Sequence, residues 1–209
     1  MSVSVSNVDA VTEVLRCCKD SKFGKVCVLN SAHFTKPGGG FIDGAISQEA
    51  MLCAESTLYN VLNHFETTYY ERSKKRINKH MYDNQALYIP NIIFSRGSES
   101  VKCDVVSCSA PNMRTALKRK TVTNPAFNKV QLEDRIAYVM DVAARHCVDT
   151  LILTPFGCDV CGQDPIEVAK TFDYLLCKYR YGFTYVIFAV GGADSNLYNV
   201  FQEYILNKQ

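Results

Sequence analysis

Three consecutive glycines, Gly38-Gly39-Gly40, come shortly before an amide and a carboxylate, Gln48 and Glu49. Glycine costs backbone entropy and packs little, so three in a row indicate a close approach or unusual backbone angles. A glycine loop beside a helix N-terminus exposes backbone N–H groups, which can receive an anionic ligand. Glu49 adds a carboxyl group, which can donate or accept a proton, at the same point. The spacing therefore predicts an anion-binding loop next to a group capable of acid–base chemistry.

The elements that must position these residues alternate between strand and helix along the chain. Strands are predicted at residues 3–6, 25–29, 87–94, 103–109, 150–154 and 185–190. Pro90 interrupts the segment 87–94, which predicts either two short strands or a bent edge strand there. Helices are predicted after a cap at Asn7 or Asp9, at 47–64 with Ser47 as N-cap, at 132–146, at 165–179, and after a cap at Asp194 or Ser195. Residues 66–84 are expected to form a loop or surface helix, and residues 112–129 a polar connection. This alternation predicts a three-layer α/β/α fold with a mostly parallel mixed central sheet.

Several residues with site potential directly follow predicted strands, namely Asn30, the triple glycine, Phe156-Gly157 and Gly191. In parallel sheets, ligands bind beyond the carboxyl ends of the strands, where the connecting loops gather. We therefore expect these residues to meet at one end of the sheet.

Length and composition are those of an ordinary globular domain. The chain has 209 residues, 47% of them hydrophobic and 21% charged, and a net charge of +2. This length is enough for one domain, predicted to span residues 1–209. The charge excludes a globally basic nucleic-acid protein. No run is apolar enough to span a membrane, and the N-terminal residues do not resemble a secretory signal, so we expect an intracellular protein.

Ten cysteines are expected to be reduced thiols in such a protein. Cys27, Cys53, Cys147 and Cys177 lie in apolar patterns and are predicted to be small core residues. Residues 158–161 form a Cys-x-x-Cys motif between a strand and a helix, which is also the placement of a redox motif or half a zinc site. No second such motif exists, so we favour a structural or loop role and expect neither a metal nor a cofactor.

The glycine and glutamate pattern resembles the signature of the bacterial-type poly(ADP-ribose) glycohydrolases, a branch of the macrodomain superfamily. That signature reads Gly-Gly-Gly, a spacer, then Gln-Glu-Glu. Here Gly38-Gly39-Gly40 is followed by a seven-residue spacer and Gln48-Glu49-Ala50. Further similar segments are Val28-Leu29-Asn30, the helix 47–59, Ala110-Pro111-Asn112 and the loop from Phe156 to Pro165. The resemblance covers nearly the whole chain and implies a macrodomain-like fold.

The resemblance also implies a ligand, which is ADP-ribose or a related ADP-ribosyl nucleotide, free or attached to a macromolecule. Glycine loops would donate N–H groups to its phosphates, and Asn30 and Glu49 would support the ribose. Gln48 would hold either a neighbouring carboxylate or the ribose. Phe156 is a candidate for stacking on the base, although its apolar setting favours the core. The candidate ligand-binding residues are Asn30, Gly38, Gly39, Gly40, Gln48, Phe156, Gly157, Cys158, Asp159, Val160 and Cys161.

Three positions depart from the family pattern. The second glutamate, usually assigned as the catalytic acid, is Ala50, and Asp159 and Cys161 replace a glycine and an aromatic residue. A carboxylate in a diphosphate loop repels the ligand unless it turns away. We therefore expect ADP-ribose recognition with weak or absent glycosidic hydrolysis. The alternative is an active hydrolase that uses Glu49 or His33, or a parent enzyme with glutamate at position 50.

Two basic runs suggest another class of function. Arg72, Lys74, Lys75, Arg76, Lys79 and His80 are interleaved with tyrosines, and Arg114, Lys118, Arg119 and Lys120 form the second run. Basic residues among aromatics can bind nucleic acid, so a nucleic-acid-binding module is the remaining alternative. The more common interpretation of such runs is a solvated face.

Overall fold

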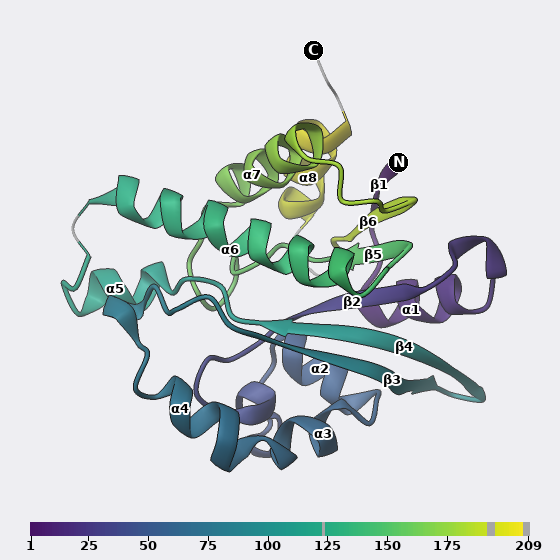
Figure 1. Ribbon diagram of the computed structural model, residues 1–209, viewed down its shortest axis with the longest axis horizontal. Coiled ribbons are helices and arrows are strands. Elements are labelled where there is room, and N and C mark those ends of the chain that lie inside the picture. The colour runs from purple at the N-terminus through teal and green to yellow at the C-terminus, as the bar shows by residue number, and fades with distance from the viewer. Residues whose placement is uncertain (123, 192–194, 207–209) are drawn as a thin grey trace.

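The computed structural model describes residues 1–122, 124–191 and 195–206, and a single central sheet organises them (Figure 1). Its strands are β1 (Ser2–Ser6), β2 (Val26–Ser31), β3 (Ala86–Arg96), β4 (Glu99–Cys108), β5 (Thr150–Leu153) and β6 (Tyr185–Ala189). Their spatial order is β1-β6-β5-β2-β4-β3. Strand β3 is antiparallel to β4, and the other neighbouring pairs are parallel. The predicted fold class, a mostly parallel mixed sheet in an α/β protein, is confirmed.

Helices cover both faces of this sheet (Figure 1). One face carries α1 (Ala10–Cys18), α2 (Gln48–Ala54), α3 (Leu58–His64) and α4 (Glu71–Ser73), and the other carries α6 (Pro125–Arg145), α7 (Pro165–Lys178) and α8 (Ser195–Leu206). The short helix α5 (Met113–Lys118) lies near one end of α6. The predicted cap Asp194 lies outside the described residues.

Successive strand residues supply two separate hydrophobic cores. Leu151 and Leu153 of β5 pack with α6, α7 and α8, whereas Ile152 between them packs on the side of α1 and α2. This alternation follows from the two-residue period of a strand. A strand buried on both faces needs a continuous apolar sequence, which β5 and β6 have.

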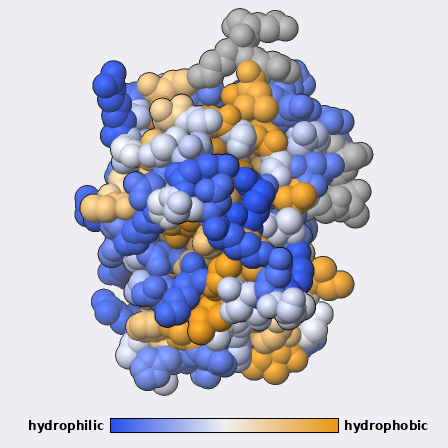
Figure 2. All heavy atoms as spheres, turned by 90° about the vertical axis from the view of Figure 1, so that its right-hand side faces the viewer, coloured by the Kyte–Doolittle hydropathy of each residue, from blue (hydrophilic) through white to orange (hydrophobic). Residues whose placement is uncertain are grey.

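The outer surface is largely polar. Figure 2 shows hydrophilic side chains over much of one face, with apolar side chains interspersed among them. Among the residues that the structure describes, no helix has the length and apolar character needed to cross a membrane.

The helix predicted at residues 47–64 is interrupted, and this corrects the sequence-based expectation. Helix α2 ends at Ala54 and α3 begins at Leu58. Between them, Ser56 forms an isolated bridge with Phe94 of β3, and the Ser56 Oγ donates to the Leu52 carbonyl at 2.6 Å. Pairing with the sheet therefore replaces the helical hydrogen bonds at this point.

Strand β3 continues through Pro90 as an edge strand with a register irregularity between Ile89 and Ile92, which is the second of the two forms predicted for this segment. Other boundaries differ from the prediction. The segment expected to be a polar connection contains α5 and the first turns of α6, capped by Asn112 and Asn124. Cys27 and Cys53 are buried as predicted, but Cys147 and Cys177 are exposed.

Gly191 provides a test of how tightly the edge of the sheet is packed. A Cβ atom at this position would lie 2.1 Å from the carbonyl carbon of Val8 and 2.6 Å from the backbone nitrogen of Asp9. Backbone atoms cannot rotate away, so we expect Gly191→Ala to lower the free energy of unfolding by about 1–3 kcal/mol. Urea unfolding measures this loss. Gly97→Asn is the control, because Gly97 lies in open space and asparagine tolerates its φ of 61°. Equal stability of Gly191→Ala and the wild-type protein would contradict the packing described here.

Candidate functional site

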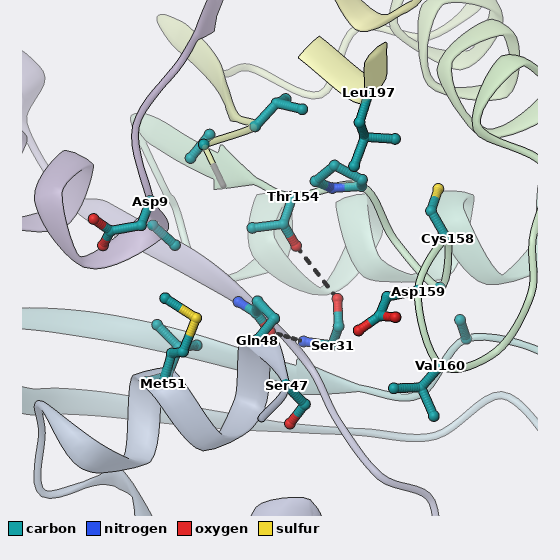
Figure 3. Close-up of a pocket in the computed structure, with 18 of the residues that line it drawn as sticks. Asp9, Ser31, Ser47, Gln48, Met51, Thr154, Cys158, Asp159, Val160 and Leu197 are labelled. Carbon is teal, nitrogen blue, oxygen red and sulfur yellow. Dashed lines mark hydrogen bonds between the residues drawn. The ribbon is translucent and has the colours of Figure 1, made fainter. Parts of the chain in front are cut away.

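A cavity of about 270 Å³ lies at the carboxyl edge of the sheet (Figure 3). It is lined by residues that follow or end β1, β2, β5 and β6, by the start of α2, and by Leu197 of α8. This is the end of the sheet at which the sequence predicted the loops to gather. Gly191 and the five candidates from Gly157 to Cys161 line the cavity.

The loop 157–161 presents backbone N–H groups rather than cationic side chains. Within the part of the chain that the structure describes, the N–H groups of Gly157, Asp159, Val160 and Cys161 donate no hydrogen bond to the protein. Gly157 has a φ of 78°, and a Cβ atom there would lie 2.6 Å from that of Ala110. Successive free N–H groups in a turn form a concavity that binds anions. The loop therefore has the chemistry of a phosphate-binding site.

This loop is fastened to the neighbouring segment, which limits its freedom. The side chain of Gln163 donates to the Pro111 carbonyl at 2.7 Å and exchanges hydrogen bonds with Asn128. The Arg114 N–H donates to the Cys161 carbonyl at 2.9 Å. A loop held in this way needs little reordering when a ligand binds, which reduces the entropic cost of binding.

Asp159 opposes an anion at the same place. Figure 3 shows its carboxylate on the side of the loop that faces Ser31, although the residue as a whole is exposed to solvent. A fixed negative charge facing a diphosphate would weaken its binding. The Asp159 side chain therefore counteracts the N–H groups of its own loop.

The two thiols of the Cys-x-x-Cys motif have the wrong properties for redox chemistry. Burial raises the pKa of Cys158 to about 12 and that of Cys161 to about 11. Reactive cysteines have a lowered pKa, because the thiolate is the nucleophile. Within the described residues, no group of three or more histidine, cysteine, aspartate or glutamate side chains is placed to hold a metal ion.

Gln48 has a different partner from the one that we expected. Its Nε2 donates to the Leu29 carbonyl at 2.9 Å, and its Oε1 accepts from the Ser31 N–H at 2.8 Å. The amide is thus bound to the end of β2 (Figure 3) rather than to a carboxylate. Gln48 still lines the cavity, and its structural task is to dock α2 on β2.

Glu49 is almost fully buried, with 1% of its surface exposed. Its carboxyl oxygens accept from the His33 N–H at 2.8 Å and from Asn30 Nδ2 at 3.2 Å. Burial raises the pKa of Glu49 to about 7, although hydrogen bonds from His33, Asn30 and Gly38 favour the charged form. The group therefore exchanges its proton near neutral pH.

The triple glycine covers this carboxyl group. Gly38, Gly39 and Gly40 have φ values of 68°, 59° and 100°. A Cβ atom on Gly39 would lie 2.6 Å from Glu49 Oε2, and one on Gly38 would lie 2.7 Å from the ring of Tyr59. The unusual angles and the close approach predicted from the sequence are both present.

Several candidates nevertheless do not line the cavity. Phe156 is fully buried in the core beside α6 and α7, as its apolar setting favoured. Asn30, the triple glycine, Glu49 and Ala50 are not among the lining residues. Asn30 Oδ1 is buried and accepts no hydrogen bond from the described residues. Glu49, Asn30, His33 and the triple glycine form a polar cluster next to Gln48, which does line the cavity.

Three further residues that line the cavity could not be identified as site residues from the sequence. Asp9, which was expected only as the cap of α1, also lines the cavity. Burial opposes its ionisation, but hydrogen bonds from Arg96 and Thr12 lower the pKa of Asp9 to about 2. Met51 and Leu197 also line the cavity, and no local pattern distinguishes them from ordinary apolar helix residues.

Comparisons with known proteins identify similar folds. Residues 1–97 match the family model of the microbial-type PARG catalytic domain. A point mutant of the poly(ADP-ribose) glycohydrolase (PARG) from Deinococcus radiodurans, in complex with ADP-ribose, has a TM-score of 0.87 and 26% identity, covering 98% of this chain and 84% of that one. The PARG from Thermomonospora curvata has a TM-score of 0.87 and 27% sequence identity, and the match covers 98% of this chain and 76% of that one. The complex of the same PARG with the inhibitor ADP-HPD has a TM-score of 0.85 and 27% sequence identity, and the match covers 97% of this chain and 78% of that one. No curated protein matches the chain.

The raised pKa of Glu49 predicts how stability depends on pH. Between 4.5 and about 7, the folded state keeps a proton that the unfolded state has lost, so stability falls as the pH rises. The total loss is about 3 kcal/mol, at 1.36 kcal/mol for each unit of pKa difference. Urea unfolding from about pH 5 to about pH 8 measures it. Glu49→Gln should remove this dependence of stability on pH, whereas Asp134→Asn, a control at an exposed site, should keep it. An unchanged dependence in Glu49→Gln would refute the raised pKa of Glu49.

Proposed function

We propose that the chain binds ADP-ribose or a closely related ADP-ribosyl nucleotide. The premise is its relationship to the microbial-type poly(ADP-ribose) glycohydrolases, which rests on sequence over residues 1–97 and on fold over nearly the whole chain. The proposed site is the cavity at the carboxyl edge of the sheet, in a single macrodomain-like domain spanning residues 1–209. The solved structure of one protein with a similar fold contains ADP-ribose, and the solved structure of another contains the inhibitor ADP-HPD.

One observation carries the proposal, namely the free N–H groups of loop 157–161 facing the cavity. A diphosphate has the size and charge to accept several such bonds at once, without any cationic side chain.

The apolar wall suits the adenosine end of the ligand. Val11, Met51 and Leu197 offer contacts for a flat base, and ligand pockets typically combine such walls with a few polar groups. Asp9 supplies a hydrogen-bond acceptor at this wall, and Arg96 keeps it ionised. A base amino group is the complementary donor.

The polar cluster suits the distal ribose. Asn30 Oδ1 is a buried acceptor with no partner among the described residues, which a ribose hydroxyl could satisfy. Glycosidic cleavage additionally needs an acid that protonates the departing oxygen. Ala50 offers none. We therefore propose that the pocket recognises the ligand and that hydrolysis is weak or absent.

A second candidate function is hydrolysis with Glu49 as the acid. The observation that favours it is the raised pKa, because an acid that titrates near neutral pH can give up its proton during turnover. Against it, Glu49 is enclosed by the His33 N–H, Asn30 and the triple glycine. Release of ADP-ribose from a modified substrate by the wild-type protein, abolished in Glu49→Gln, would favour this function over recognition alone.

The carboxylate of Asp159 makes ligand binding tunable. We expect Asp159→Asn to bind ADP-ribose about fivefold more tightly, because removing one charge close to a diphosphate in a water-like medium is worth about 1 kcal/mol. Isothermal titration calorimetry measures the affinity. Asp141→Asn, an exposed site on α6, is the charge-matched control. Weaker binding by Asp159→Asn would place the phosphates elsewhere, and no binding by any of the three proteins would refute the proposed function.

Installing the missing acid tests the proposed division between recognition and chemistry. We expect Ala50→Glu to release ADP-ribose from a modified substrate at least about a hundredfold faster than the wild-type protein, since general acids contribute about 10²–10⁴-fold. Product release is followed by chromatography. Position 50 is buried, so Ala50→Gln controls for the added volume, and thermal melting shows whether both variants fold. Equal rates for a folded Ala50→Glu variant and its Gln control would contradict this role for position 50.

A further inference from the structure

Two basic runs that lie far apart in the sequence meet in the structure. Lys79 and His80 form a short turn that packs against α5 and the residues just after it. The Thr121 Oγ1 donates to the Lys79 carbonyl at 3.0 Å, and the Asn112 N–H donates to the His80 carbonyl at 2.8 Å. We name Lys79, Arg114, Lys118, Arg119 and Lys120 the basic cluster.

The side chains of the basic cluster are free to meet an external anion. All five residues are exposed, and within the described residues none forms an ion pair. Nearby cations behave differently, because Lys74 is paired with Glu71 and Arg76 lies 3.9 Å from Asp83. Unpaired cations crowded together repel one another, so a bound polyanion would stabilise them.

The basic cluster adjoins the cavity through the anion-binding loop. Arg114 contacts that loop, since its N–H donates to the Cys161 carbonyl and its Cβ lies against Gly162. A chain of phosphates leaving the cavity on this side would therefore meet Arg114 and then the rest of α5.

A second connection runs from the polar cluster around Glu49. The residue after His33, Phe34, stacks on Tyr82 with ring centroids 4.0 Å apart and an interplanar angle of 7°. Tyr82 follows the turn of Lys79 closely in sequence, and buried Arg135 holds it by donating to the Tyr82 carbonyl at 2.9 Å. The half-buried ring of Tyr82 thus connects the polar cluster, where we propose that the distal ribose binds, to the basic cluster.

We propose that the basic cluster binds the phosphates of a single-stranded nucleic acid whose terminal ADP-ribosyl group occupies the cavity. This inference rests on the proposed function and names the class of molecule that carries the ADP-ribose. Cationic grooves beside aromatic rings are the usual means of binding single strands.

The arrangement of the cations favours a nucleic-acid strand over a polymer of ADP-ribose. Lys118, Arg119 and Lys120 are consecutive, and Arg114 lies one helical turn before Lys118 on the same side of α5. Neighbouring residues at a helix end point in different directions, so these cations are spread around the end of α5 and offer separate contacts to successive phosphates at single-nucleotide spacing. In poly(ADP-ribose), phosphates come in adjacent pairs separated by two sugars. The ring of Tyr82 lies where the first base of a strand could stack.

The test compares the affinities of the full chain for four ligands, each used as a fluorescent probe or as a competitor. These are free ADP-ribose, a short single-stranded DNA with ADP-ribose on its terminal phosphate, the same DNA without it, and poly(ADP-ribose). Fluorescence anisotropy gives each Kd over a series of salt concentrations. We expect the modified strand to bind at least about tenfold more tightly than free ADP-ribose, because the two contacts act together.

The triple variant Lys118→Gln, Arg119→Gln and Lys120→Gln should lose this gain and still bind free ADP-ribose normally. Its salt dependence, the slope of log K against log of salt concentration, should fall by about two, at about 0.7 for each phosphate contact of a single strand. The control triple variant, Lys22→Gln, Lys102→Gln and Lys178→Gln, removes the same charge elsewhere and should keep the gain. Thermal melting confirms that both fold.

Four outcomes would overturn the inference. The modified strand gains nothing over free ADP-ribose, the gain survives in the first triple variant, or the unmodified strand binds as tightly as the modified one. In the fourth, only poly(ADP-ribose) shows a gain that depends on the basic cluster, and the polymer is the occupant. Failure of the proposed function differs from all of these, because free ADP-ribose then does not bind the wild-type protein and both proposals fall.

Discussion

The docking of α2 on the end of β2 is the interaction on which the rest of the site depends. Gln48 satisfies the Leu29 carbonyl and the Ser31 N–H, and Glu49 satisfies the His33 N–H. Buried backbone groups that lack partners cost about 1–3 kcal/mol each, so two side chains here replace hydrogen bonds that the sheet cannot supply beyond its last residue. As a result, the first two residues of α2 have different surroundings. Gln48 lines the cavity, and Glu49 lies in the closed polar cluster.

The cavity combines opposing electrostatic features. Free N–H groups of loop 157–161 attract an anion, while the carboxylate of Asp159 repels it from the same loop. Asp9 is a second carboxylate at the wall, but Arg96 compensates its charge at 2.9 Å. Asp159 forms no such ion pair within the described residues, so the two carboxylates are not equivalent. A diphosphate at this loop is therefore attracted by the N–H groups and repelled by Asp159, whereas the paired carboxylate of Asp9 adds little net charge.

The sequence predicted the sheet and its ligand-binding edge because both follow from local patterns, namely apolar strands and the residues directly after them. It failed where a partner distant in sequence decides the conformation. Ser56 leaves the predicted helix because Phe94 of β3 pairs with it. Gln48 turns to β2 for the same reason. Met51 and Leu197 could not be found, because the sequence does not show which apolar side chains border a cavity.

Ala50 and the basic cluster bear on the same chemical question. An acid is needed in glycosidic cleavage because an alkoxide leaves poorly unless it is protonated. A phosphate leaves as a stable anion and needs far less protonation, and nearby cations stabilise its charge. The absence of an acid at position 50 would therefore matter least for an ADP-ribosyl group that is linked to phosphate. The nucleic-acid strand inferred from the basic cluster provides that linkage, so the loss at position 50 and the cations of α5 favour the same class of substrate.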